Sequence, residues 1–263
     1  MVAAPHAVRL QDTCREVTPI IPLRDNIPTR RYPYVNKTLV VLNVLIFLYE
    51  VGLGRRASWL LYQWGLIPAR LWGLADFDGL GWAGYTLGAA GPLPPAWVTL
   101  VTSMFLHAGW IHVGSNMLYL WIFGDNVEDR LGHARFAAFY LISGVAAGLL
   151  QAIFAARATV PTIGASGAVA GVLGAYYILY PWARVSTLVP IFFFLTVVEI
   201  PAGIFLLLWF FIQLWNGALS ISAAPTLVGG VAWWAHIGGF VAGVLLLRGW
   251  GIRRRPPLPP GWL

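Results

Sequence analysis

Charged residues are scarce in this sequence of 263 residues, because Asp, Glu, Lys and Arg together make up only 10%. A soluble domain usually carries about 25%. Hydrophobic residues reach 59% and the mean hydropathy is +0.72, so too few polar groups exist to cover a surface in water. This balance excludes a disordered chain, a nucleic-acid-binding protein and an ordinary soluble enzyme. The single cysteine, Cys14, excludes an internal disulfide.

Long stretches without any charge indicate where the chain crosses a membrane, at residues 79–124, 136–156, 158–183 and 200–247. A helical span needs about 20 mostly apolar residues, and continuous apolar runs favour helices over strands. The sequence therefore predicts an all-α polytopic membrane protein. Its six transmembrane helices are expected at residues 37–54, 111–128, 135–156, 165–182, 200–217 and 231–248.

Arginine and lysine orient these helices, because cytoplasmic loops carry an excess of both. They gather at the two ends of the chain, so we expect both termini in the cytoplasm. The first apolar span begins late and lacks a small-residue cleavage pattern, so it is interpreted as a retained anchor and not a secretory signal. The expected domains are a cytoplasmic tail at residues 1–33, a six-helix membrane domain at 34–250 and a cytoplasmic tail at 251–263.

Two connecting segments have unusual compositions. The loop at residues 55–110 is rich in Gly, Pro and Trp, and Trp prefers the membrane interface. We therefore expect this loop to lie half-sunk in the outer leaflet. The segment 185–199 is apolar and lies between Pro190 and Pro201. It is expected to be an interfacial stretch on the cytoplasmic side.

Polar side chains at membrane depth are costly and indicate function. Ser166 stands between Gly164 and Gly167 at the expected start of a helix. A lone serine in a membrane helix commonly bonds to an upstream carbonyl. Glycine, however, lets backbone N–H groups approach a reacting oxygen, and a helix start presents unpaired N–H groups. This setting makes Ser166 a candidate nucleophile.

A serine nucleophile needs a base, and His236 is the candidate. It lies 70 residues after Ser166, early in the last span and near the same outer face. Small residues surround both: Gly167 and Gly171 form one G-x-x-x-G face, and Gly239 and Gly243 form another. Such faces let helix backbones approach closely. The glycines pack helices on either interpretation, and the hypothesis is that this packing brings Ser166 to His236.

His112 and Asn116 are four residues apart and share a helix face. Both can donate hydrogen bonds, either to another helix or to the oxyanion of a tetrahedral intermediate. No acidic residue in the sequence completes a triad: Glu50, Glu128 and Glu199 all fall near helix ends. A dyad of Ser166 and His236 is the simplest hypothesis.

At these residues the chain resembles the rhomboid family of intramembrane serine proteases, in particular a bacterial branch of it. Four elements stand in the family's order: His112-x-x-x-Asn116, Glu128-x-Arg130, Gly164-x-Ser166-Gly167, and Ala235-His236 with Gly239. The resemblance covers about residues 20–250. It is strengthened by the stretch LVTSMFLH at 100–107 and by the N-terminal IPLRDNIPTRRYPYVN.

The resemblance implies a serine endopeptidase that cleaves transmembrane segments of membrane proteins. Ser166 would attack the peptide carbonyl, and His236 would act as base and then as acid. The oxyanion would be held by His112, Asn116 and the backbone N–H of Ser166. Helix 200–217 and the loop 217–230 would act as gate and cap. Glu128 and Arg130 would tie cytoplasmic helix ends together.

Two features depart from the family's pattern. Many relatives have a Trp-Arg pair just before the second span, where this chain has Trp97-Val98-Thr99. Some relatives place a tyrosine four residues after the serine to stack on the histidine, where this chain has Ala170. Tyr119 or another aromatic residue would then have to orient His236.

Two other functions compete with proteolysis. An inactive rhomboid-like protein would bind transmembrane helices without cutting them, and a small transporter would also bury polar groups. The expected partners are transmembrane protein substrates and the lipid bilayer of a bacterial plasma membrane. We expect no nucleic acid, cofactor or metal, and the sequence leaves the oligomeric state open.

Overall fold

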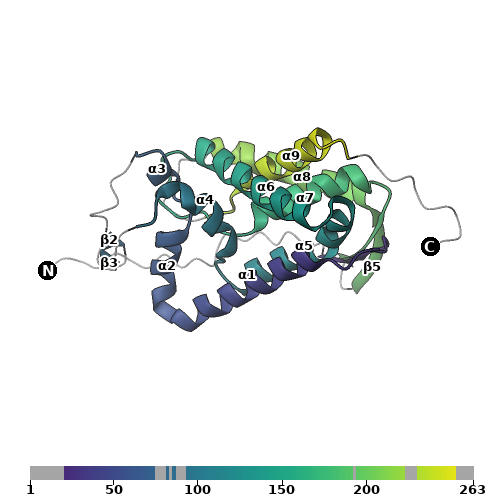
Figure 1. Ribbon diagram of the computed structural model, residues 1–263, viewed down its shortest axis with the longest axis horizontal. Coiled ribbons are helices and arrows are strands. Elements are labelled where there is room, and N and C mark those ends of the chain that lie inside the picture. The colour runs from purple at the N-terminus through teal and green to yellow at the C-terminus, as the bar shows by residue number, and fades with distance from the viewer. Residues whose placement is uncertain are drawn as a thin grey trace, which may run out of the picture.

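The computed structural model describes residues 21–74, 81–82, 85–86, 93–191, 194–222 and 230–252. Helices dominate this part of the chain (Figure 1). The long helices are α1 (Tyr34–Leu53), α5 (Trp110–Leu131), α6 (His133–Phe154), α7 (Ser166–Leu179), α8 (Ala202–Ser222) and α9 (Trp233–Gly249). Each overlaps one of the six segments expected from the gaps between charges.

Short elements connect α1 to α5. They are the helices α2 (Ala57–Trp64), α3 (Pro68–Leu71) and α4 (Thr99–Thr102), and the strands β2 (Gly81–Trp82) and β3 (Tyr85–Thr86). Three 3₁₀ turns, Gly54–Arg56, Ala96–Val98 and Ser103–Phe105, lie between them. Part of the expected membrane-embedded loop 55–110 lies outside the described residues, so its position relative to the lipid stays a prediction.

Within the described residues, three helical stretches are long and apolar enough to cross a membrane: Tyr34–Trp64, His133–Phe154 and Ala202–Ile221. A fourth exists if Ala96–Phe105 and Trp110–Leu131, which meet at an angle of 82°, count as one span. Helix α7 has only 14 residues and α9 has 17. The chain is therefore a mostly helical multi-pass membrane protein, and the count of six spans stays a prediction.

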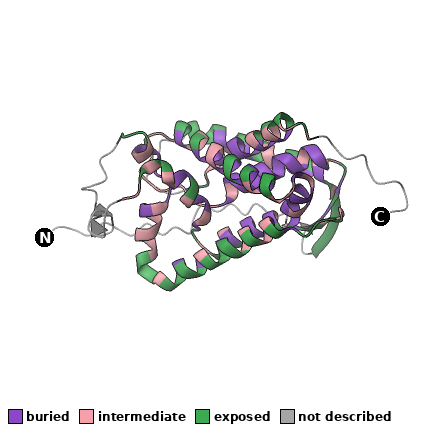
Figure 2. Ribbon diagram, viewed as in Figure 1, coloured by how far each residue is buried: buried purple, intermediate pink, exposed green. Residues whose placement is uncertain are grey.

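Helix α7 forms the centre of the bundle. Its residues Gly167–Tyr176 are all buried, and it contacts α5, α6, α8 and α9 (Figure 2). A helix of 14 residues is only about 21 Å long, against a hydrocarbon thickness of about 30 Å. Pro181 follows its last turn and cannot continue the helix. Surrounded by other helices, α7 does not need the length of a helix that faces lipid.

Helices α7 and α9 pack backbone to backbone through glycine. A Cβ added at Gly171 would lie 3.2 Å from the carbonyl oxygen of Gly239, and one at Gly167 would lie 3.6 Å from that of Ala235. A Cβ at Gly239 or Gly243 would collide with the backbone of α7. Because only hydrogen occupies these positions, the backbones of the two helices lie against each other.

The all-α prediction was wrong at one end of the bundle. Strands β1 (Ile21–Asp25), β4 (Arg184–Ile191) and β5 (Phe194–Pro201) form an antiparallel sheet in the order β1-β4-β5 (Figure 1). The apolar segment 185–199 is thus a hairpin, favoured by its β-branched residues. Pro190 is tolerated because β1 pairs with β4 only as far as Leu188.

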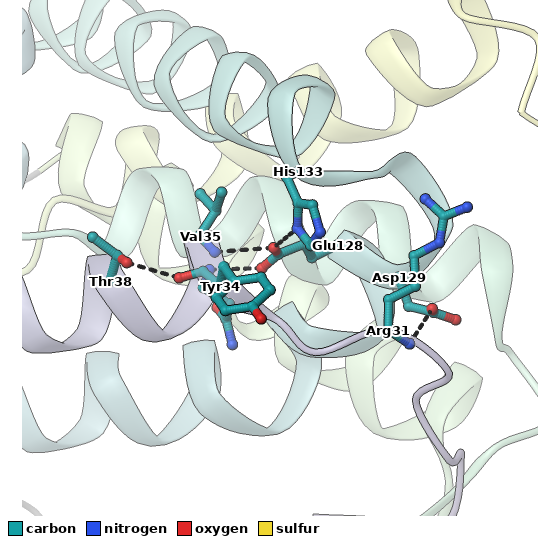
Figure 3. A network of polar contacts seen from close by, with 8 residues as sticks. Arg31, Tyr34, Val35, Thr38, Glu128, Asp129 and His133 are labelled. Atoms are coloured by element: carbon teal, nitrogen blue, oxygen red, sulfur yellow. Dashed lines mark hydrogen bonds and ion pairs between the residues drawn. The ribbon is translucent and has the colours of Figure 1, made fainter.

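Residues 21–33, expected to be part of a cytoplasmic tail, are joined to the helices. The backbone N–H of Arg31 donates to Asp129 at 3.0 Å. The carboxylate of Glu128 accepts from the N–H groups of Val35 and Asn36, at 2.9 and 2.6 Å, in the first turn of α1 (Figure 3). These N–H groups have no partner within the helix. Glu128 therefore caps α1 and ties it to α5.

The same glutamate contacts α6, since His133 Nδ1 lies 2.5 Å from Glu128 Oε1. Glu128 is 1% exposed, so its charge is stabilised by these three partners and not by water. Arg130, which the resemblance groups with Glu128, lies two residues further along α5 and is half-buried. The C-terminal segment 253–263 lies outside the described residues.

Asp25 joins the sheet to the helices. Its carboxylate accepts hydrogen bonds from Tyr176 of α7 and, at 2.8 Å, from the side-chain amide of Asn126 of α5. Burial raises the pKa of Asp25 to about 6, although the hydrogen bonds from Tyr176 and from the backbone N–H of Ile27 act in the opposite direction. The folded protein therefore binds this proton more tightly than the unfolded chain does.

We expect Asp25 to contribute stability that is lost as the pH rises from about 4 to 6, because a folded pKa above the unfolded value favours folding only while the group is protonated. The expected loss in free energy of unfolding is about 1–3 kcal/mol. Thermal unfolding of the detergent-solubilised protein between pH 4 and 8 measures it. Asp25→Asn should flatten the profile, and an unchanged slope in that variant would assign the titration to another group.

Candidate active site

A cavity of about 1790 Å³ opens between the first turns of α5, α7 and α9. Helix α7 leads into β4, so its first residue lies at the end of the bundle away from the sheet. The four polar residues singled out from the sequence, Ser166, His236, His112 and Asn116, all line this cavity. Other lining residues include Tyr119, Gln151, Trp209, Trp233 and Trp234.

Ser166 is the first residue of α7. Gly164, two residues earlier, has φ +121°, a value that side chains rarely allow. A Cβ there would lie 2.6 Å from Nε2 of His112 and 3.7 Å from Oγ of Ser166. The glycine therefore has two functions: it permits the turn into α7 and leaves space for the imidazole beside the serine.

The segment before Ser166 is held by the residues around 103–107. The N–H of Gly164 donates to the carbonyl of Ser103 at 2.9 Å, and the N–H of Ala165 lies 3.5 Å from Nε2 of His107. The buried carboxylate of Glu50 accepts from the backbone N–H of His107 at 3.2 Å. Glu50 thus supports the loop that holds the serine, and in this structure it does not contact His236.

His112 has one nitrogen fixed by the backbone. Its Nδ1 accepts a hydrogen bond from the N–H of Ala108 at 3.3 Å. A neutral imidazole that accepts at Nδ1 carries its proton on Nε2. The donor nitrogen of His112 therefore faces Gly164 and Ser166. The amide of Asn116 donates to the carbonyl of His112 at 2.9 Å and has a second N–H to offer.

His236 is oriented by α8. Its Nδ1 lies 2.8 Å from Oε1 of Gln213, whose amide nitrogen donates to the carbonyl of Trp209 at 3.2 Å. Because the amide oxygen of Gln213 can only accept, Nδ1 of His236 is the donor and carries the proton. Nε2 then has a free lone pair. This is the tautomer that a general base requires.

Aromatic rings enclose the same imidazole. Its centroid lies 5.8 Å from that of Trp209, tilted by 34°, and 6.2 Å from that of Trp233, edge to face. Tyr119, which we considered for this role, stacks at 6.4 Å on Phe205 instead. Ala170, at the position of the family's stacking tyrosine, is buried in α7. The contacts to His236 come from α8 and from α9 itself.

Ser166 and His236 are neighbours without a hydrogen bond between their side chains in this structure. Gly167, which follows Ser166, packs against Ala235, which precedes His236. This contact keeps the serine and the histidine close. Catalytic hydrogen bonds are often long before substrate binds and tighten in the complex. Part of the expected cap, residues 223–229, lies outside the described residues.

Comparison with known proteins identifies the family. The Rhomboid domain matches residues 94–253, which include Ser166, His236, His112 and Asn116. The chain belongs to the rhomboid family. It is mostly helical, membrane-embedded and related to rhomboid serine proteases.

Similar proteins occur in fungi and in a bacterium. Rhomboid protein 1, mitochondrial, of Saccharomyces cerevisiae is 32% identical over 161 residues, which cover 60% of this chain and 42% of that protein. Rhomboid-type serine protease 2 of Emericella nidulans is 33% identical over 93 residues, 35% of this chain and 18% of that protein. Rhomboid protease GluP of Bacillus subtilis is 39% identical over 79 residues, which cover 30% of this chain and 15% of that protein. The chain spans less than half the length of these relatives, and they do not single out a bacterial branch.

Proposed function

We propose that the chain is an intramembrane serine endopeptidase that cleaves transmembrane segments of membrane proteins. The observation that carries the proposal is the convergence of Ser166, His112, Asn116 and a His236 of the base tautomer on one cavity. Six helices crossing a plasma membrane, with both termini in the cytoplasm, form part of the same proposal.

The reaction begins when Oγ of Ser166 attacks the carbonyl carbon of a peptide bond and its proton passes to Nε2 of His236. The oxyanion accepts hydrogen bonds from the backbone N–H of Ser166, from Nε2 of His112 and from the amide of Asn116. The imidazolium then protonates the leaving amine. Water attacks the acyl-enzyme, His236 takes its proton, and the carboxylic product leaves as Ser166 is protonated again.

Reconstitution in proteoliposomes with single-span model substrates tests the proposal. Substrates with small residues near the outer end of their helix unwind most readily, so we expect these to be cut. Mass spectrometry of the products locates the cut. Intact substrate that copurifies with the protein would instead favour the inactive binder, and solute uptake without cleavage would favour the transporter.

Gln213 provides a prediction that depends on the tautomer of His236. Gln213→Met keeps the side-chain length but removes the acceptor, so the imidazole can rotate or carry its proton on the wrong nitrogen. We expect kcat to fall about 10- to 100-fold while KM and the thermal midpoint change little. Initial rates on a cleaved model substrate measure the change.

Two variants control for the loss of packing. Gln213→Glu retains an acceptor and should keep most of the activity, with the acid limb of its pH–rate profile moved to higher pH because a carboxylate stabilises imidazolium. Gln151→Met removes an acceptor from the neighbouring backbone N–H of Ala235, bonded at 3.2 Å, and leaves the ring untouched. If Gln151→Met and Gln213→Met lost the same amount of activity, Gln213 would not act by orienting His236.

A further inference from the structure

A second cavity, of about 350 Å³, lies at the end of the bundle that carries the sheet, away from Ser166. The segment before α1, the first turn of α1 and the second half of α5 line it. Its lining residues are Thr29, Arg30, Arg31, Tyr32, Pro33, Asn36, Lys37, Trp121 and Asp125. The proposed peptidase mechanism uses none of them.

The cavity is positively charged. Its lining holds three cations, Arg30, Arg31 and Lys37, and one carboxylate, Asp125. A second carboxylate, of Asp129, accepts from the backbone N–H of Arg31 at 3.0 Å, and an excess of positive charge remains. Across the part of the chain that the structure describes, no ion pair joins any of these three cations to an acidic residue. Nζ of Lys37 lies 3.9 Å from the ring centroid of Tyr32 and 5.4 Å from that of Trp121. Cations concentrated in this way attract an anion.

An apolar surface continues from the charged cavity along α1. Lys37, Val41 and Leu45 follow each other at intervals of four residues and share one face of the helix. Val41 is 56% exposed and Leu45 is 58% exposed. Figure 2 shows the exposed face of α1 running along the outside of the bundle. Since α1 belongs to a stretch able to cross a membrane, this face meets acyl chains.

Aromatic residues mark the boundary between the two surfaces. Trp121 is 52% exposed and Tyr32 is 55% exposed, and both line the charged cavity. Trp and Tyr prefer the level of the lipid headgroups. The cavity therefore lies where a headgroup lies, with cations on its polar side and an apolar helix face on the other. A free phosphate ion would use only the first of these surfaces.

We propose that this cavity binds the phosphate of an anionic phospholipid, whose acyl chains lie along the exposed face of α1 that begins at Lys37. The excess positive charge favours a lipid with net negative charge over a zwitterionic one, whose ammonium group the cations would repel. The site is independent of Ser166 and His236, so it does not rest on peptidase activity.

Native mass spectrometry of the detergent-released protein tests the site with two lipids of matched chains, phosphatidylglycerol and phosphatidylcholine. We expect phosphatidylglycerol to bind at least tenfold more tightly. Arg30→Gln/Arg31→Gln should reduce that preference about tenfold, as should Lys37→Met, whereas Lys37→Arg should retain it. Arg55→Gln/Arg56→Gln, which removes two exposed arginines from the 3₁₀ turn that follows the other end of α1, is the matched control and should leave binding unchanged.

Three outcomes would overturn the proposal. Equal retention of the two lipids by the wild-type protein would mean that charge does not select the ligand. If the 30/31 and 55/56 variants lost the same preference for phosphatidylglycerol, the lipid would be attracted by the overall charge of the protein and not by this cavity. Displacement of phosphatidylglycerol by millimolar inorganic phosphate would assign the cavity to a free anion. The comparison of lipids on the wild-type protein holds even if a variant fails to fold.

Discussion

Ser166→Ala should abolish peptide cleavage and labelling by a fluorophosphonate probe while leaving the helices folded. The side chain is half-buried at the start of α7 and supplies only its hydroxyl to the cavity, so its removal leaves no large void. The loss expected for a catalytic nucleophile is about 10⁴-fold or more. Probe labelling resolved on a gel, together with cleavage of a model substrate, measures both effects.

A second serine of the same cavity is the matched control. Ser115 lines it from α5 and donates its hydroxyl to the carbonyl of His112 at 3.1 Å. Ser115→Ala should therefore keep its labelling and most of its activity. If Ser166→Ala were labelled as strongly as the wild type, the nucleophile would be another residue, and the proposed mechanism would fail at its first step.

The positions of the long helices could be predicted because lipid imposes a simple rule on the sequence. Charge is excluded over most of the length of a membrane helix, and the spans expected on that basis at residues 111–128, 135–156 and 200–217 match α5, α6 and α8 to within five residues at each end. The rule overestimates α7, which was expected over residues 165–182 and ends at Leu179. Apolar composition measures burial, and it does not distinguish lipid from a surrounding helix bundle.

The sheet could not be predicted from the same signal. Its central strand pairs with residues 21–25, more than 150 positions away, which were expected to be part of a tail because they precede the first apolar span. The aspartate at the end of β1 shows why charge content does not reveal this sheet. Asp25 carries a charge in the sequence, yet it is held inside by Tyr176 and Asn126, and its pKa rises to about 6.

In the candidate site, too, the sequence identified the polar residues but not all of their contacts. The sequence alone singled out four residues because they are polar within apolar runs: Ser166, His236, His112 and Asn116. Gln213 meets the same criterion, since it lies in the charge-free run 200–247. Its partner, however, is set by how α8 packs on α9, and the sequence separation of 23 residues gives no hint of the contact.

His236→Ala should reduce cleavage about as far as Ser166→Ala, because a serine hydroxyl without a base is a poor nucleophile. The structure adds a way to separate loss of the base from loss of folding. The cavity of about 1790 Å³ is large enough to admit free imidazole to the position of the deleted ring. Added imidazole should therefore restore part of the rate, and its effect should follow the fraction of imidazole that is unprotonated.

A variant of His112 provides the contrast to His236→Ala, because the imidazole of His112 acts as a hydrogen-bond donor and not as a base. His112→Ala should slow cleavage about 10²- to 10³-fold, the usual effect of losing one oxyanion donor. Because its base is intact, this variant should keep the pH dependence of the wild type and should gain less from added imidazole. Rescue of both variants to the same extent, with the same pH dependence, would show that the two histidines do not have separate roles.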